Sequence, residues 1–167
     1  MMLWWEQIMT KPEINISVKQ NLNLCLNESR LQGIVLKTLE AEGIVSSAEI
    51  GLVITDSKTI QKLNRTYRGD DKSTDVLAFH MITGMNQKPE QSFVDPPDGV
   101  RHLGEVMISY TQAVKQAQEQ GHNVAQELAL LIVHGVLHLL GYDHELPQEN
   151  QLMRAKENEI LGILDSK

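Results

Sequence analysis

The sequence predicts an α/β fold of the α+β kind, with a single mixed sheet of about four strands and about five helices packed on it. Two patterns predict this class. Short segments that alternate apolar and polar residues are separated by longer segments with helical periodicity. One helical segment near the carboxyl end is apolar on nearly every side, so we expect it to be a buried central helix. Because 167 residues can bury a sizeable core, we expect residues 1–167 to form one domain.

The first third of the chain alternates strands and helices. Residues 13–20 (EINISVKQ) alternate apolar and polar side chains, as a half-buried strand does. Residues 28–42 place apolar side chains on one helical face, and Gly43 follows as a helix stop. Residues 48–54 (AEIGLVI) then predict a second strand.

The middle of the chain adds a helix, a strand and a long loop. Asp56 is a good N-cap for a helix over 57–68. The residues expected along one side of this helix are Ile60, Leu63, Asn64 and Tyr67. Residues 75–80 (DVLAFH) form a short β-rich run. The segment 81–100 is rich in Gly, Pro and polar residues, and loops of this length are often functional.

The last third is mainly helical. Residues 101–109 (RHLGEVMIS) predict a strand, and a helix over roughly 110–120 follows. Asn123, with a glutamine three residues later, forms the capping-box pattern of a helix that runs to Gly141. This is the segment expected to be buried. Pro147 opens a final helix.

Composition limits the classes of function. The net charge of −7 argues against a generic nucleic-acid binder, although a local basic patch can oppose the global sign. No segment approaches the roughly 20 apolar residues of a membrane span, and residues 1–12 lack the features of a signal peptide. The single cysteine, Cys25, excludes an intrachain disulfide and is expected to be a small core residue. We therefore expect a cytoplasmic protein with no membrane partner.

The histidines of HGVLHLLGYDH (134–144) give the strongest functional signal. His134 and His138 are four residues apart, so on a helix they stand one turn apart on one face and can bind one metal ion. Gly141 can take the left-handed conformation that ends the helix, which lets His144 turn back as a third ligand. A single histidine on an apolar helix is more often a core residue, but three with this spacing indicate a metal site.

Ligation by imidazoles favours Zn2+, one ion per chain, although nickel, cobalt and copper accept the same ligands. Three histidines leave one position of a tetrahedral zinc for water, as in catalytic zinc sites. Asp143 could orient a ligand imidazole or cap the turn. The spacing matches the zinc-protease pattern H-E-x-x-H-x-x-G-x-x-H, except that Gly135 replaces the glutamate that acts as the base. Peptide hydrolysis by that route is therefore disfavoured.

A second unusual segment is LNRTYRGDDKSTDVLAFH (63–80). Arg68 ends the predicted helix, where interaction with the helix dipole and solvation explain it without any function. Thr74 and Asp75 fit a turn or a strand-entry cap. On its own, this segment carries no assignment.

Taken together, LNRTYRGDDKSTDVLAF (63–79), LGEVMIS (103–109) and HGVLHLLGYDH (134–144) resemble the YbeY family, the bacterial endoribonucleases of ribosomal RNA maturation. The resemblance covers most of the chain from about residue 48 to the end. The histidine motif with its Gly-Tyr-Asp turn is highly specific. Residues 1–12 lie outside the resemblance and are interpreted as an N-terminal extension.

The resemblance implies a single-domain metal-dependent hydrolase with one zinc ion held by His134, His138 and His144. It also implies a cleft with a functionally important arginine, Arg68. The implied reaction is hydrolytic cleavage of single-stranded RNA, with roles in 16S rRNA 3′-end processing and ribosome quality control. The implied partners are an rRNA precursor and ribosomal small-subunit proteins.

The second segment departs from the family pattern at four positions. Asp70 stands where lysine is common, Ser73 and His80 where proline is common, and Ala78 where serine is common. The lost cation weakens the expected phosphate contact near Arg68. We expect His80 to add a polar group at the cleft rather than a metal ligand.

The expected mechanism is metal-assisted phosphodiester hydrolysis in which Arg68 neutralises charge on the phosphoryl oxygens. The base is unassigned. Glu105, Asp75 and a second water are candidates, and attack by the ribose 2′-OH stays open. Two other functions also stay open: a metal hydrolase of another substrate class, and a non-catalytic ribosome-assembly factor whose zinc stabilises the fold.

Overall fold

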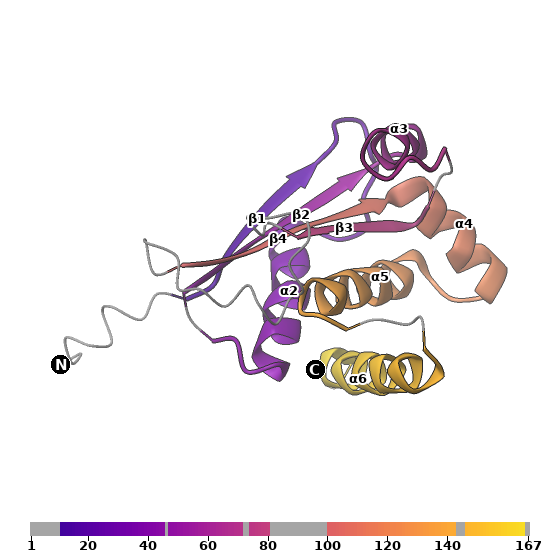
Figure 1. Ribbon diagram of the computed structural model, residues 1–167. Helices are drawn as coiled ribbons and strands as arrows, with labels where there is room; N and C mark the ends of the chain where they lie inside the picture. Colours follow the sequence, from indigo (N-terminus) through magenta and orange to yellow (C-terminus); the bar gives the residue numbers. More distant parts are fainter. Residues whose placement is uncertain (1–10, 46, 72–73, 81–99, 143–145, 166–167) are drawn as a thin grey trace.

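The computed structural model describes residues 11–45, 47–71, 74–80, 100–142 and 146–165 (Figure 1). Within these ranges the chain forms one mixed four-stranded sheet and five helices, which confirms the α/β class. In chain order the elements are β1 (Glu13–Val18), α2 (Glu28–Ala41), β2 (Ala48–Thr55), α3 (Ser57–Arg68), β3 (Val76–His80), β4 (Arg101–Ser109), α4 (Tyr110–Gln120), α5 (Val124–Leu139) and α6 (Pro147–Asp165).

The sheet has the order β1-β2-β4-β3, with β1, β2 and β4 parallel and β3 antiparallel to β4 at the edge. In β3, Ala78 lies opposite Val106, and the next residue, Phe79, lies opposite Glu105. Successive side chains of a strand point to opposite faces. The edge strand β3 therefore presents side chains to the layers on both sides of the sheet.

Helix α5 is the centre of the core. Figure 1 shows α5 and then α6 beneath the sheet, with α3 on the opposite side near the end of β2. Helix α5 contacts α2, α4, α6, β3 and β4, which confirms the expected buried central helix. Each fully buried aliphatic side chain contributes roughly 1.5–3 kcal/mol. Those of α5 that are fully buried are Leu128, Ile132, Val133, Val136 and Leu137.

Caps set the helix boundaries. The side chain of Asp56 accepts a hydrogen bond from the Thr59 backbone N–H at 2.8 Å, so α3 begins where the sequence predicts. Gly69, with φ 70°, ends α3 in the left-handed conformation. Helix α5 ends at Leu139, slightly before the expected Gly141, which has φ 104°.

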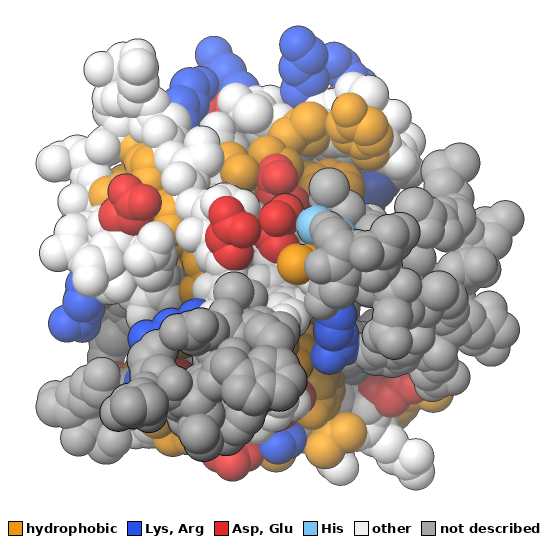
Figure 2. Space-filling model, turned by 90° about the vertical axis from the view of Figure 1, so that its left-hand side faces the viewer, with side chains coloured by type: hydrophobic (Ala, Val, Ile, Leu, Met, Phe, Trp, Pro, Cys, Tyr) orange, Lys and Arg blue, Asp and Glu red, His pale blue; other side chains and the backbone are white. Residues whose placement is uncertain are grey.

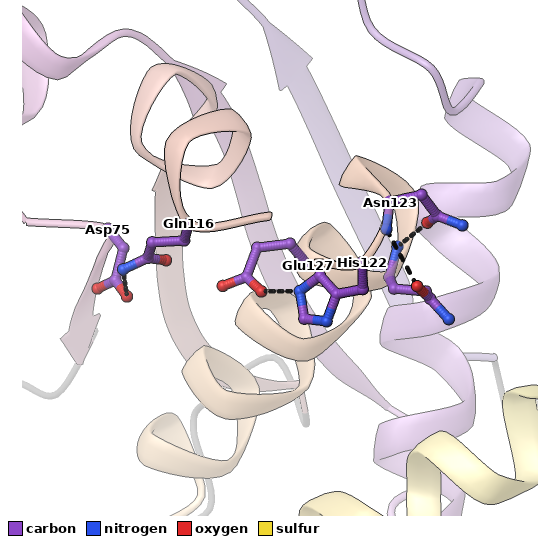
Figure 3. A network of polar contacts seen from close by, with 6 residues as sticks. Asp75, Gln116, His122, Asn123 and Glu127 are labelled. Carbon is purple, nitrogen blue, oxygen red and sulfur yellow. Dashed lines mark hydrogen bonds and ion pairs between the residues drawn. The ribbon is translucent and has the colours of Figure 1, made fainter. Parts of the chain in front are cut away.

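Two polar interactions fix the amino end of α5 (Figure 3). Asn123 and Gln126 form the predicted capping box, each side chain accepting from the other's backbone N–H. Glu127 is only 2% exposed, and its carboxylate lies 2.6 Å from Nε2 of His122. A buried carboxylate requires such a partner.

One sequence expectation is wrong: Cys25 is exposed rather than part of the core. It lies in a segment outside the helices and strands where Leu22, Leu24 and Leu26 pack against the core, so the intervening side chain points outward. Tyr67, at the end of the helix side that holds the buried Ile60 and Asn64, is 69% exposed.

Some expectations fall on residues that the structure does not describe. The expected loop 81–100 lies outside the described residues except for Val100, and the N-terminal extension 1–12 is described only from Lys11. None of the helices in the described ranges is long and apolar enough to cross a membrane.

Charge is unevenly distributed. Figure 2 shows acidic side chains gathered near the middle of one face, with Lys and Arg toward its edges. Helix α3 has the opposite character, because its sequence SKTIQKLNRTYR holds four cations and no carboxylate. Helix α3 is therefore locally basic in a chain of net charge −7, although Asp56 caps it and Asp70 and Asp71 follow it.

Candidate functional site

A pocket between α3, β3 and α5 brings together the two segments that the sequence singles out. Its volume is about 500 Å³. Arg68 comes from the end of α3, and His134 and His138 come from α5. The complete set of lining residues is Asn64, Arg68, Asp70, Thr74, Asp75, Val76, Leu77, Ala78, His80, His134, Gly135 and His138.

His134 and His138 face each other across one turn of α5. Their Nε2 atoms are 3.2 Å apart, and their rings meet nearly edge to face, with centroids 4.6 Å apart. Two nitrogens bound to one tetrahedral zinc at about 2.0–2.1 Å each lie about 3.3 Å from one another. The spacing of the imidazole nitrogens therefore fits a shared metal ion.

Glu157 of α6 orients His134. Its Oε1 lies 2.5 Å from Nδ1 of His134. A carboxylate at this position favours the tautomer with the proton on Nδ1 and the lone pair on Nε2, as in many metal sites. Sequence reasoning missed Glu157. A signal exists, because Glu157 falls between Met153 and Ile160 on the buried side of α6, where a carboxylate needs a partner.

The third predicted ligand, His144, lies outside the described residues, as does Asp143. Within the described ranges, no group of three or more His, Cys, Asp or Glu side chains is arranged to hold a metal ion. The structure thus brings His134 and His138 together with Arg68, and it leaves the place of His144 in the site as a prediction.

The end of α5, just before His144, is fixed by a polar cluster. Burial, followed by a hydrogen bond to Glu42, raises the pKa of Tyr142 to about 12. Lys156 of α6 lies 3.5 Å from the same carboxylate, and its own pKa is raised by Glu42 and Glu159. Glu42, the C-cap residue of α2, therefore interacts with both Tyr142 and Lys156 of α6.

Gly135 marks the closest approach of α5 to the sheet. A Cβ added there would lie 2.5 Å from Cγ1 of Val106 and 3.1 Å from Cγ2 of Val76. Real Cβ atoms essentially never lie within 3.0 Å of another heavy atom, so the Val106 side chain or the packing around it would have to shift. Zinc proteases carry glutamate at this position. Here the side chains of Val106 and Val76 occupy the space that a side chain at position 135 would need.

Arg68 is held at the free edge of β3. Its Nη2 donates to the carbonyl oxygen of Ala78 at 3.0 Å, and its guanidinium carbon lies 5.9 Å from the centre of the Phe79 ring. A guanidinium has five N–H donors, so this anchor leaves capacity for phosphoryl oxygens. The replacement of serine by alanine at position 78 does not disturb the anchor, because the acceptor is a backbone atom.

His80 and Asp70 also line the pocket, at its exposed rim. Desolvation, followed by the positive charge of Arg68, lowers the pKa of His80 below its ordinary value. The ring is therefore biased toward the neutral form, which can donate and accept one hydrogen bond each. His80 thus contributes a polar group to the pocket.

Asp75 lines the pocket but is engaged on both carboxylate oxygens. Oδ1 accepts from the Thr74 hydroxyl at 3.3 Å, and Oδ2 accepts from the side-chain amide of Gln116 at 3.1 Å (Figure 3). Its backbone carbonyl accepts from the Ser109 N–H at 2.9 Å. These contacts give Asp75 the role of a strand-entry anchor.

Glu105, the other carboxylate considered as a base, is on the wrong side of the sheet. It precedes Val106, which faces α5, and its own side chain packs over Gly51 on the opposite face. Glu105 does not line the pocket. The sequence could not reveal this, because the strand's facing depends on how β2, β3 and β4 pair.

The chain is similar to known proteins over nearly its whole length. The sequence model of the family described as "Endoribonuclease YbeY" matches residues 13–165. A protein named Endoribonuclease YbeY from Roseiflexus castenholzii is 42% identical over 152 residues, covering 90% of this chain and 92% of the relative. One of the same name from Dehalococcoides mccartyi is 44% identical and covers 87% and 89%.

The fold also matches a solved structure. The solution structure of a Thermotoga maritima protein superimposes with a TM-score of 0.55 at 23% identity, covering 92% of both chains. At this identity the likeness concerns the fold alone.

Proposed function

The chain belongs to the Endoribonuclease YbeY family, and from this premise we propose that it is a zinc-dependent endoribonuclease that cleaves single-stranded RNA. We further propose that it acts in the cytoplasm on the 3′ end of the 16S rRNA precursor and in ribosome quality control, with ribosomal small-subunit proteins as partners.

The proposal rests on one observation: the same pocket is lined by two candidate metal ligands and by an arginine that can bind phosphate. The paired imidazoles of His134 and His138 have the spacing of metal ligands. Arg68 lines the same pocket, and it offers the planar donor set that suits a phosphodiester. A metal site next to an arginine is a combination that suits hydrolysis of a charged phosphodiester.

Each residue has a distinct task. His134, His138 and His144 would hold the zinc ion, with Glu157 keeping the His134 ring in the metal-binding tautomer. When bound, zinc supplies Lewis acidity, which lowers the pKa of a coordinated water to about 7. Arg68 binds the phosphoryl oxygens and stabilises the negative charge that develops on them, from a guanidinium already fixed by the Ala78 carbonyl.

The proton acceptor remains to be assigned. Glu105 is directed away from the pocket and Asp75 is engaged on both oxygens, which leaves Asp70, at the rim, as the other carboxylate among the described lining residues. His80 lies at the rim with its pKa lowered, so its neutral ring is able to accept a proton. Water and the substrate's own 2′-OH are the other candidates.

A peptide substrate is less compatible with this site. A glutamate at position 135 would meet Val106 and Val76, so the base of the protease mechanism has no room. A non-catalytic ribosome-assembly factor, the other alternative, would use the same metal ion and the same cleft but would not cleave RNA. The net charge of −7 is compatible with docking onto basic ribosomal proteins in either case.

The test is cleavage of a defined 16S rRNA precursor by the zinc-loaded protein, with and without a chelator, and with casein and simple esters in parallel. We expect cleavage of the precursor near its 3′ end, loss of cleavage with the chelator, and recovery when zinc is restored. RNA binding should survive chelation better than cleavage does.

Three results would contradict the proposal. Cleavage that survives exhaustive chelation points to a contaminating nuclease. RNA binding without cleavage, in the presence of ribosomal subunits as well as alone, favours the assembly factor. Hydrolysis of casein or esters in preference to RNA favours a different substrate class.

A further inference from the structure

The exposed side chain of Tyr67 does not line the pocket and has no role in the proposed reaction. Among the described aromatic side chains, Tyr67 alone is exposed, at 69%. It directly precedes Arg68 at the end of α3. A surface ring of this size leaves apolar area in water that is available to a flat ligand.

The ring of Tyr67 is braced by a second aromatic side chain. Tyr67 meets Phe79 of β3 edge to face, with ring centroids 5.8 Å apart and an interplanar angle of 70°. Phe79 is half-buried and also lies against the guanidinium of Arg68. These two contacts give the ring a defined orientation beside the arginine, which lowers the entropic cost of binding a flat ligand.

The ligand chemistry follows from the surroundings. Proteins that bind single-stranded RNA stack its unpaired bases on exposed aromatic rings and hold its phosphates with cations. At the end of α3, Tyr67 and Arg68 provide the ring and the cation, whereas Lys58, Lys62 and Arg65 lie exposed on the opposite side of the helix from Tyr67.

We propose that Tyr67, braced by Phe79, is the stacking site for one unpaired nucleobase of an RNA strand whose phosphate is bound at Arg68. The inference rests on the proposed function and extends it. It gives a structural cause for single-strand preference, because a base within a duplex is already stacked on both faces and cannot reach the ring.

The test combines protein variants with RNAs that each lack one base. A short unstructured RNA is made with a single abasic position at each site in turn. Its binding to zinc-loaded wild type, Tyr67→Ala and Tyr67→Phe is followed by fluorescence anisotropy in stopped flow, before cleavage proceeds. Leu152→Ala is the matched control, because Leu152 is also apolar and exposed, at 56%, and does not line the pocket.

In wild type, we expect one abasic position to weaken binding by roughly 5- to 100-fold, the usual effect of a lost stack. In Tyr67→Ala, binding of the intact RNA should be weaker by a similar factor, and the same abasic position should have no further effect. Tyr67→Phe and Leu152→Ala should bind like wild type. The zinc content and thermal unfolding of all variants should be unchanged.

The inference is overturned if Tyr67→Ala binds intact RNA as wild type does, or if the abasic effect persists without the ring. Cleavage of the intact RNA by the same preparations separates this failure from that of the proposed function. Wild type that cleaves RNA with no dependence on Tyr67 rejects the stacking site alone. Wild type that shows the Tyr67-dependent base effect but never cleaves rejects the nuclease and retains the stacking site.

Discussion

The two walls of the pocket are built in different ways. On the α5 wall, His134 and His138 project from the helix that forms the centre of the core, and Gly135 between them touches the sheet. On the α3–β3 wall, Arg68 lies in the last turn of α3, and its side chain donates a hydrogen bond to the Ala78 carbonyl of the edge strand β3. The α5 wall is therefore fixed by dense packing in the core. The α3–β3 wall is fixed by the C-cap of α3 and a few surface contacts.

This difference teaches that metal binding and substrate binding depend on separate parts of the fold. Changes in the α5 wall should alter metal affinity or stability, because their neighbours cannot move without opening the core. Changes in the α3–β3 wall should alter the handling of RNA and leave the metal in place.

Removing the arginine should have the largest effect. Arg68→Ala is expected to lower RNA turnover by roughly 10²–10³-fold, as the loss of a donor to transition-state charge does in other enzymes. Zinc content and the midpoint of thermal unfolding should stay at wild-type values. Turnover is measured by single-turnover cleavage of the rRNA precursor, and zinc by elemental analysis.

Arg68→Lys is the matched control, because it keeps the charge and removes the planar donor set. It should recover only a small part of the lost turnover. Turnover of Arg68→Ala equal to wild type would contradict the role of Arg68. A loss of zinc in either variant would contradict the separation of substrate binding from metal binding.

Glu157→Gln should weaken metal binding. The amide keeps the shape of the side chain but loses the charge that holds the proton on Nδ1 of His134. Loss of such a partner typically costs about 10- to 100-fold in metal affinity, which we expect in a competition titration against a fluorescent zinc chelator. Glu159→Gln, at an exposed carboxylate on the same helix, should leave the affinity unchanged. Equal affinities for the two variants would refute the role of Glu157.

Gly135→Ala should destabilise the fold, although alanine is the better helix former. The added Cβ would meet Val106 at 2.5 Å, and overpacking of this kind costs roughly 1–3 kcal/mol. The free energy of unfolding is measured by urea denaturation. In a Val106→Ala background, Gly135→Ala should lower the free energy of unfolding by less than it does in the wild type.

Gly162→Ala is the control for Gly135. Gly162 lies within α6, and a Cβ added there has no atom within 4 Å. This substitution should stabilise the protein by about 0.5–1 kcal/mol through helix propensity. Opposite signs at the two glycines support the close approach of α5 to the sheet, and the same sign at both contradicts it.

Asp56→Asn should have the smallest effect, and one that depends on pH. The ion pair with Lys19 and hydrogen bonds from Thr59 hold the pKa of Asp56 well below its ordinary value. The stabilisation from its charge is therefore present above about pH 4, the ordinary carboxyl pKa, and is lost as pH falls through the lowered pKa. Asparagine caps a helix equally well.

The wild type should thus exceed Asp56→Asn in unfolding free energy by at most about 1 kcal/mol at pH 7, since the pair is partly exposed. The difference should shrink progressively below about pH 4. A difference that is constant over this range would mean that the charge of Asp56 does not stabilise α3.

The sequence predicts best where the signal is local. Asp56 and Gly69 mark both ends of α3, and the apolar character of the segment after Asn123 identifies the central helix. The spacing of His134 and His138 is also local, since one helical turn brings the rings together whatever surrounds them.

Features of the site that depend on tertiary contacts could not be predicted from the sequence. The role of Gly135 depends on how near α5 lies to β4, and the facing of Glu105 depends on strand pairing. Glu157 reaches His134 only because α6 packs on α5. A core position for Cys25 is expected from the residue type alone, and packing places its side chain in solvent.

Metal binding by the α5 wall is tested directly by the zinc stoichiometry of three proteins prepared in the same way: wild type, His138→Ala and Arg68→Ala. We expect one zinc per chain in wild type and Arg68→Ala, a stoichiometry well below one in His138→Ala, and loss of RNA cleavage in both variants. Full zinc occupancy in His138→Ala would contradict the claim that the α5 wall binds the metal.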